Sequence, residues 1–192
     1  MYMLLFWIII SSSRLYLNQY KYIDLYMSSV HSMISPILYY NALLDDNTSV
    51  LTFSLLYFTI DTFIVNEIQY KIHHIVSLCA ICTSMYYQTN QLILINCLFY
   101  AEYPVLLFNY IDYMSRSSMN IVYPIYYNIL ASLHLLMMIH SRVYHLGQIG
   151  YNCILYLEHD TCFYIGITVH FIIYSVSLKW VITRCKELYL DN

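Results

Sequence analysis

Long apolar stretches separated by short polar breaks run through the whole chain. A helix that crosses a bilayer needs about 20 mostly apolar residues, within a range of about 17–25. The stretches that approach this length lie at about 2–13, 27–44, 50–66, 72–87, 91–111, 121–141 and 161–183. The first is short, but it lacks the basic start and the small-residue cleavage site of a signal peptide. The pattern therefore predicts about seven membrane-spanning helices.

The apolar runs also exclude a membrane β-barrel. FWIII and LASLHLLMMI do not alternate apolar and polar residues, as barrel strands do. In lipid, only a helix satisfies its backbone polar groups within a single segment. The polar breaks are short, so consecutive helices are expected to be antiparallel neighbours. With no internal repeat and no linker, the prediction is one all-α polytopic bundle over residues 1–192.

Composition agrees with a membrane environment. Of the 192 residues, 60% are hydrophobic and only 10% are charged, whereas a soluble domain carries about 25% charged residues. The 24 tyrosines suit the interface of a bilayer, where the apolar ring can lie among the acyl chains while the hydroxyl group contacts water. A net charge of −3 without a basic run gives no reason to expect a nucleic-acid partner.

The distribution of charge predicts an orientation. With seven spans, every Lys and Arg except Arg142 falls on one side of the membrane, whereas Asp45, Asp46, Glu158 and Asp160 fall on the other. Basic residues are enriched in cytosolic loops. The N-terminus is therefore expected on the lumenal (outside) face, and the C-terminus in the cytosol.

The six cysteines are scattered. Cys79 and Cys82 form a CxxC pair inside an apolar stretch without a second pair, which favours packing over metal or redox chemistry. Cys153 and Cys162 flank the last polar loop, and could form a disulfide if that loop faces an oxidising lumen.

Ionisable residues inside the apolar stretches are the candidates for function, because a charge in mid-membrane costs about 2.5–3.5 kcal/mol even on lenient scales. Such side chains are expected to face the interior of the bundle and to find partners there. They are His31, Asp61, His73, His74, Glu102, His134, His140, Arg142, His170 and Lys179.

Asp61 and the pair His73–His74 lie on either side of one short turn. Neighbouring residues on a helix point about 100° apart, so one histidine can face the interior while the other contacts a neighbouring helix. A carboxylate beside an imidazole fixes its tautomer and raises its basicity, as a general base or nucleophile requires. The alternative is that both histidines are interfacial anchors bound to lipid headgroups.

Glu102 and Pro104 lie in the middle of the fifth stretch. Proline removes a backbone N–H and kinks a helix, and a kink beside a carboxylate often lines a cavity. The alternatives are a protonated Glu102 or one bonded to Tyr or Arg142, and Arg142 itself could snorkel to the interface. The lone His134, His140 and His170 suit satisfied core positions.

No metal or cofactor is expected. Membrane di-iron sites use HxxxH and HxxHH clusters, whereas only His73 and His74 are adjacent here. GxSxG, P-loop and dinucleotide-binding fingerprints are missing from the sequence.

Several short motifs occur in an order that resembles a known family. They are Ser28-Ser29-Val30-His31, Tyr57-Phe58-Thr59-Ile60-Asp61, Lys71-Ile72-His73-His74-Ile75-Val76, Glu102, Arg142 and Leu178-Lys179-Trp180. Over residues 26–186 the chain resembles the TLC-domain membrane proteins, which include translocation-associated membrane proteins, ceramide synthases and the ceroid-lipofuscinosis protein. The resemblance implies a barrel of about six helices around a central cavity, in the endoplasmic reticulum or another intracellular membrane.

The chain also departs from the family's pattern. Pro104 follows Glu102 by two residues where the family often has four, and residues 94–98 contain neither the His nor the Asp of the HDxxD segment of ceramide synthases. The chain therefore resembles a short branch without synthase activity. For that branch the resemblance implies roles in membrane lipid composition, sensing or trafficking, with membrane lipids, acyl-CoA or sphingolipid-like molecules as partners.

Three hypotheses follow. In the first, the protein binds or senses a lipid in an interior cavity lined by His31, Glu102 and Arg142. In the second, His73 or His74 acts as base or nucleophile in acyl transfer or lipid hydrolysis, with Asp61 orienting it. In the third, the polar residues only join helices of a cargo or trafficking protein.

Overall fold

The computed structural model describes residues 2–16, 24–65, 68–157 and 161–189, and within these ranges the fold is all-helical, without strands. The elements are α1 (Tyr2–Tyr16), α2 (Asp24–Leu44), α3 (Val50–Ile64), α4 (Ile68–Tyr87), α5 (Gln91–Glu102), α6 (Val105–Arg116), α7 (Met119–Val122), α8 (Pro124–Met138), the π-helix η1 (Ile139–His145), α9 (Leu146–Tyr156) and α10 (Thr161–Tyr189). The predicted all-α class is confirmed.

Within the described residues, two helical segments are long and apolar enough to cross a membrane. They are Gln91–Arg116, which comprises α5 and α6, and Phe163–Lys186 within α10. Of the 18 most apolar consecutive residues in each segment, only 28% and 11%, respectively, are buried inside the protein. Helices of this length that turn most of their apolar side chains outward suit a lipid environment better than water. Helix α3 is apolar but shorter.

The helices differ from the expected segments after residue 141. A polar loop was expected over residues 145–160, but α8 continues through η1 into α9 as far as Tyr156. The π-helical turn keeps the backbone hydrogen-bonded while it takes Ser141 and Arg142 into the interior, where both are buried. The helix therefore continues past Ser141 and Arg142, because these polar side chains point into the interior of the bundle.

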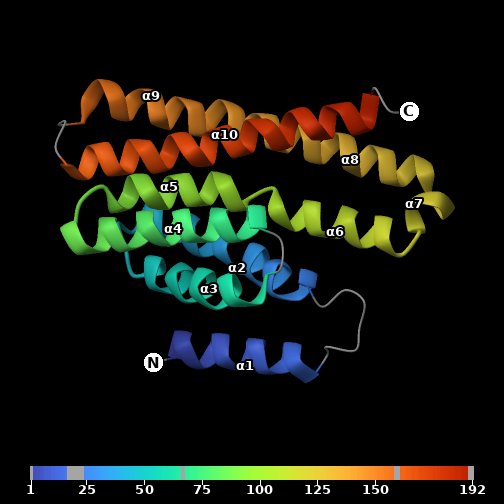
Figure 1. Ribbon diagram of the computed structural model, residues 1–192, viewed down its shortest axis with the longest axis horizontal. Helices are drawn as coiled ribbons and strands as arrows, with labels where there is room; N and C mark the ends of the chain where they lie inside the picture. Colours follow the sequence, from blue (N-terminus) through green and yellow to red (C-terminus); the bar gives the residue numbers. More distant parts are fainter. Residues whose placement is uncertain (1, 17–23, 66–67, 158–160, 190–192) are drawn as a thin grey trace.

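Most helices lie side by side along one axis, as Figure 1 shows. Helix α2 packs against α3, α5 and α6; α3 packs against α4, and α4 against α10. Helix α10 in turn packs against α8, η1 and α9, and α9 packs against α5. Helix α1 lies at the edge of the bundle and contacts α2 and α3.

The main core joins the first five helices. Trp7, Met27, Leu51, Ile81 and Ile95 are each fully buried in one cluster. The Trp7 indole N–H donates to the carbonyl oxygen of Phe53 over 3.1 Å, which satisfies the polar tip of a buried ring. This core fixes α2, α3, α4 and α5 against one another, and these four helices carry the polar cluster described next.

We expect Ile95→Ala to lower the free energy of unfolding by about 2–5 kcal/mol, because it leaves a cavity in this core. Leu136→Ala is the control, since Leu136 is 64% exposed on α8. The measurement is an SDS unfolding titration in mixed micelles. Equal losses in the two variants would contradict the packing described here.

Candidate functional site

Four buried ionisable side chains meet between four different helices. His31 comes from α2, Asp61 from α3, His74 from α4 and Glu102 from the last position of α5. Their exposed fractions are 0%, 6%, 6% and 5%. The chain thus brings together residues that are far apart in sequence, and shields them from the surroundings of the bundle.

His31 and Glu102 form the first acid–imidazole pair. The His31 Nδ1 atom lies 3.3 Å from the Glu102 Oε2 atom. Glu102 also interacts electrostatically with His73 and Arg142. A buried carboxylate is tolerated only when it has such partners, so this pair accounts for a Glu inside an apolar helix.

His74 and Asp61 form the second pair, with 3.7 Å between the His74 Nδ1 and Asp61 Oδ2 atoms. The Tyr57 hydroxyl, one turn before Asp61 on α3, donates to Asp61 Oδ2 over 3.3 Å. The Tyr57 ring stacks on the His31 ring with 3.7 Å between centroids and 7° between planes. Tyr57 therefore connects the two pairs.

Sequence reasoning did not name Tyr57 as a site residue. It precedes Asp61 by four positions, so the two share one face of α3. That spacing is the signal by which it could have been found.

His73 points away from this centre. Its ring contacts Phe58 and Trp180, with centroids 6.1 Å and 6.0 Å away, and it is half-buried. The adjacent histidines thus occupy different sides of α4, as their helical spacing predicts. His74 faces a carboxylate, whereas His73 packs toward α10.

Arg142 lies inside the bundle, only 4% exposed, and does not snorkel to an interface. One of its Nη atoms donates to the carbonyl oxygen of Ala101, and its guanidinium lies 5.1 Å from the centroid of the Trp180 ring. Helix α5 ends at Glu102, since Pro104 has no N–H with which to continue the ladder. A cation at this C-terminal end is favourable for the helix dipole.

Two buried nitrogen atoms of the cluster, Nε2 of His31 and Nε of Arg142, have no hydrogen-bond partner within the described ranges. Nδ1 of His31 and Nδ1 of His74 instead face the carboxylates of Glu102 and Asp61. Buried polar groups are nearly always hydrogen-bonded, and leaving one unmet costs about 1–3 kcal/mol. The arrangement can therefore accept a polar group supplied from outside the chain.

The other sequence candidates lie apart from the cluster. His134 is buried on α8, His170 lies with its Nδ1 atom 3.7 Å from Sγ of Cys97, and His140 and Lys179 are exposed. The side chain of Cys162 lies outside the described part of the chain, so the pairing of Cys153 with Cys162 stays a prediction.

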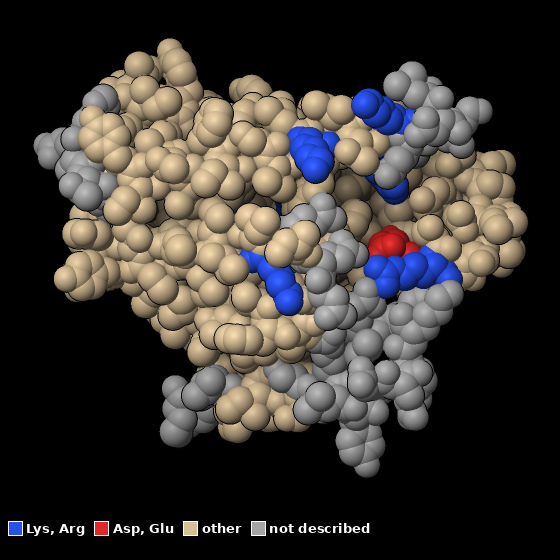
Figure 2. Space-filling model, in the orientation of Figure 1, with Lys and Arg blue, Asp and Glu red and all other residues tan. Residues whose placement is uncertain are grey.

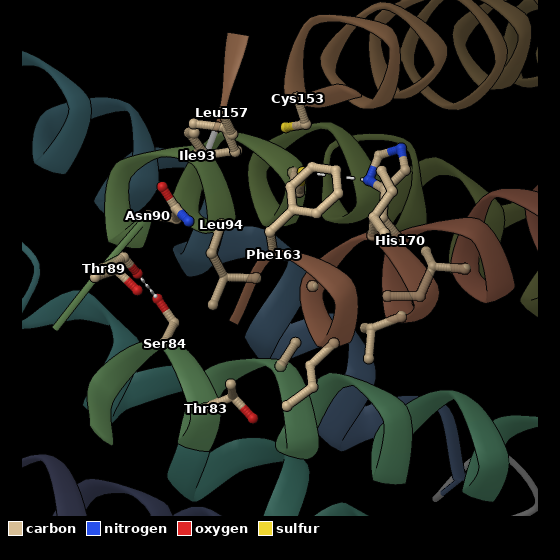
Figure 3. Close-up of a pocket in the computed structure, with 17 residues that line it drawn as sticks. Thr83, Ser84, Thr89, Asn90, Ile93, Leu94, Cys153, Leu157, Phe163 and His170 are labelled. Carbon is tan, nitrogen blue, oxygen red and sulfur yellow. Dashed lines mark hydrogen bonds between the residues drawn. The ribbon is translucent and has the colours of Figure 1, made fainter. Parts of the chain in front are cut away.

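An apolar cavity of about 110 Å³ lies between α4, α5, α9 and α10 (Figure 3). Cys97, Cys153 and His170 line it together with aliphatic side chains, and Thr89 and Asn90 lie at its edge. Gly150 makes room for His170, because a Cβ atom there would come within 2.6 Å of the imidazole Nε2. A second cavity, of about 310 Å³, lies between α2 and α6.

The expected lipid-cavity residues His31, Glu102 and Arg142 line neither of these two cavities. The cluster and the apolar cavity are nevertheless neighbours, because α4 and α5 contribute to both. On α5, Cys97 in the cavity precedes Glu102 in the cluster by five positions, or about 7.5 Å along the helix.

Comparisons with protein-family models, curated proteins and solved structures find no match for this chain.

We expect Arg142→Met to lower the free energy of unfolding by about 1.5–3 kcal/mol, the usual loss for a hydrogen bond to a charged group. Arg116→Met is the matched control. The Arg116 guanidinium lies 2.8 Å from Asp112, but the two side chains are 33% and 25% exposed, and exposed ion pairs contribute little. SDS titration of both variants measures the difference, and equal stability would contradict a capping role for Arg142.

Proposed function

We propose that this chain is a multi-pass membrane protein that binds a membrane lipid in its interior, and thereby senses or regulates membrane lipid composition. The proposal rests on one observation: four buried ionisable side chains lie close together inside the bundle. They are His31, Asp61, His74 and Glu102. A membrane protein bears the cost of burying four ionisable groups mainly where they serve a ligand or a reaction.

The proposed topology has seven spans, six of which enclose the site in a barrel similar to that of TLC-domain proteins. Helix contacts support it, since the neighbours run α2, α3, α4, α10, α8–α9, α5–α6 and back to α2. A lumenal N-terminus and a cytosolic C-terminus are supported by the basic side chains gathered on one half of the face in Figure 2. The endoplasmic reticulum or another intracellular membrane is the proposed location.

In this proposal the two parts of a lipid occupy the two neighbouring environments. The polar group of the lipid meets the unpartnered Nε2 atom of His31 and Nε atom of Arg142, and Glu102 supplies charge beside them. One acyl chain enters the apolar cavity on the same helices, whose lining is almost entirely carbon. An amphiphile fits a polar cluster beside an apolar cavity better than a wholly polar ligand does.

A second candidate is acyl transfer or lipid hydrolysis, which the Asp61–His74 pair favours. Asp61 faces Nδ1, which leaves Nε2 as the basic nitrogen. That nitrogen would attack the carbonyl carbon of an acyl thioester such as acyl-CoA. The thiolate would leave and take up a proton, and the acyl group would pass from the imidazole to an alcohol, an amine or water.

Lipid binding predicts that His74→Asn and Glu102→Gln each reduce the amount of lipid retained by the purified protein to less than half. Glu102→Gln keeps the size of the side chain but removes the charge beside the lipid's polar group, and His74→Asn removes the imidazole that faces Asp61. His140→Asn is the control, because His140 is exposed and faces His145. Quantitative mass spectrometry of extracted lipids gives the readout. A lipid content identical in all four proteins would contradict the proposal.

Acyl transfer predicts a covalent adduct of one acyl group after incubation with a long-chain acyl-CoA. The adduct should be seen by intact-mass spectrometry, should be lost in His74→Asn, and should form more slowly in Asp61→Asn, which cannot support the imidazole in the same way. His140→Asn should behave as the unsubstituted protein does. The lack of both adduct and turnover with several acyl donors would remove this candidate while leaving lipid binding untouched.

A further inference from the structure

The cavity of about 310 Å³ between α2 and α6 is bordered by three tyrosines. Tyr26 comes from the first turn of α2, and Tyr110 and Tyr113 come from the second half of α6. Tyr110 and Tyr113 are 41% and 39% exposed, so the cavity opens at the surface of the bundle. None of the described residues that line it carries a charge. The cavity therefore offers mainly aromatic ring surface to a ligand.

Asn109 and Ser29 form the polar part of this lining. Asn109 is only 4% exposed, and its Nδ2 atom donates to Oγ of Ser28 over 3.0 Å and to Oγ of Ser29 over 3.2 Å. A hydroxyl that accepts one hydrogen bond keeps its own proton for donation. These hydrogen bonds hold α6 against α2, and they place a hydroxyl donor beside the tyrosines.

This tyrosine-lined cavity adjoins the polar cluster. Ser29 precedes His31 by two positions on α2, and Leu106 follows Glu102 by four positions, or about 6 Å along the helical segment. The apolar cavity lies on the opposite side of the cluster, along α5, whereas α6 continues beyond the end of α5 (Figure 1). The apolar cavity, the polar cluster and the tyrosine-lined cavity thus follow one another along the bundle.

The tyrosine-lined cavity lies close to the ends of two helices. Tyr26 follows the first residue of α2 by two positions, and Tyr113 precedes the last residue of α6, Arg116, by three. Arg116 lies 2.8 Å from Asp112, so these two charges balance each other. Tyrosine is enriched at the level of the lipid headgroups. A ligand in this cavity would therefore lie where the headgroup of a membrane lipid lies.

We infer that the tyrosine-lined cavity binds the choline group of a choline phospholipid. A quaternary ammonium has no N–H to donate, and the electron-rich faces of aromatic rings attract it. The primary ammonium of ethanolamine carries three N–H donors, which call for acceptors such as carboxylates, and the described lining contains none.

A lipid is the source of the choline group because the cavity continues into the polar cluster and then toward the apolar cavity. The phosphate of the same lipid lies near Ser29 and the unpartnered nitrogens of His31 and Arg142, and an acyl chain lies in the apolar cavity. This inference rests on the proposed lipid binding and names the headgroup.

The test measures which phospholipid the full-length protein retains from mixed micelles. Phosphatidylcholine and phosphatidylethanolamine with identical acyl chains are offered in equal amounts, and native mass spectrometry counts the bound lipids. The unsubstituted protein should retain roughly threefold more phosphatidylcholine, an effect of the size expected from a cation–π contact. Tyr110→Leu should abolish this preference because the ring is lost. Tyr110→Phe should keep most of it because the aromatic face remains.

Tyr87→Leu is the matched control. Tyr87 on α4 is 47% exposed, similar to Tyr110, and lines neither of the two cavities. This variant should keep the full preference. Equal retention of the two lipids by the unsubstituted protein, loss of the preference in Tyr110→Phe, or the same loss in Tyr87→Leu as in Tyr110→Leu would overturn the inference while lipid binding stands. Retention of neither lipid would instead contradict the proposed function itself.

Soluble phosphocholine separates the two possible sources of the choline group. It is added at the same concentration as the lipid. Unchanged retention of phosphatidylcholine supports a lipid that is held by its headgroup and its acyl chain together. Displacement of phosphatidylcholine would show that the cavity serves a soluble choline compound, and would overturn the assignment to a lipid.

Discussion

The negative charge of the Glu102 carboxylate, at the end of α5, has to be balanced by donors and positive charge. Much of the interior of the bundle supplies these partners. His31 approaches it from α2, and Arg142 approaches from η1 while donating to the carbonyl oxygen of Ala101. A carboxylate in a medium of low dielectric loses most of its hydration, so these partners cannot be removed independently of one another. The break at Pro104 exposes backbone carbonyl groups at the same level, which gives the guanidinium a second acceptor. Helices α2, α5 and η1 are thereby held together by one charge.

Because the partners of Glu102 gather around its charge, the interior is divided into a polar part near the end of α5 and an apolar part at the cavity. Near the break, the side chains that face inward are imidazoles, carboxylates and a guanidinium. About two turns further along α4 and α5 they are aliphatic groups and thiols, with His170 accommodated against Gly150. Because α4 and α5 pass through both parts, a ligand bound in one would contact helices that form the other.

The sequence predicted much of the fold and part of the site. The beginnings and ends of α2, α3 and α10 lie within a few residues of the expected segments, because length and apolar content decide them. Helix α9 was missed, because residues 145–160 were expected to form a polar loop. The meeting of Asp61 with His74 could be expected across one short turn. The stacking of Tyr57 on His31 could not, because it depends on how α2 packs against α3, and so it is a property of tertiary packing.

The π-helical turn η1 determines how α9 is rotated about the helix axis relative to α8. A π-turn holds one more residue than an α-helical turn, so it acts as an insertion of a single residue. Were η1 to relax into regular α-helix, α9 would rotate by about 100° relative to α8. Gly150 would then leave the His170 ring, and a bulkier residue would turn toward it. Movement of Arg142 would in this way be transmitted to the His170 side chain in the wall of the neighbouring cavity.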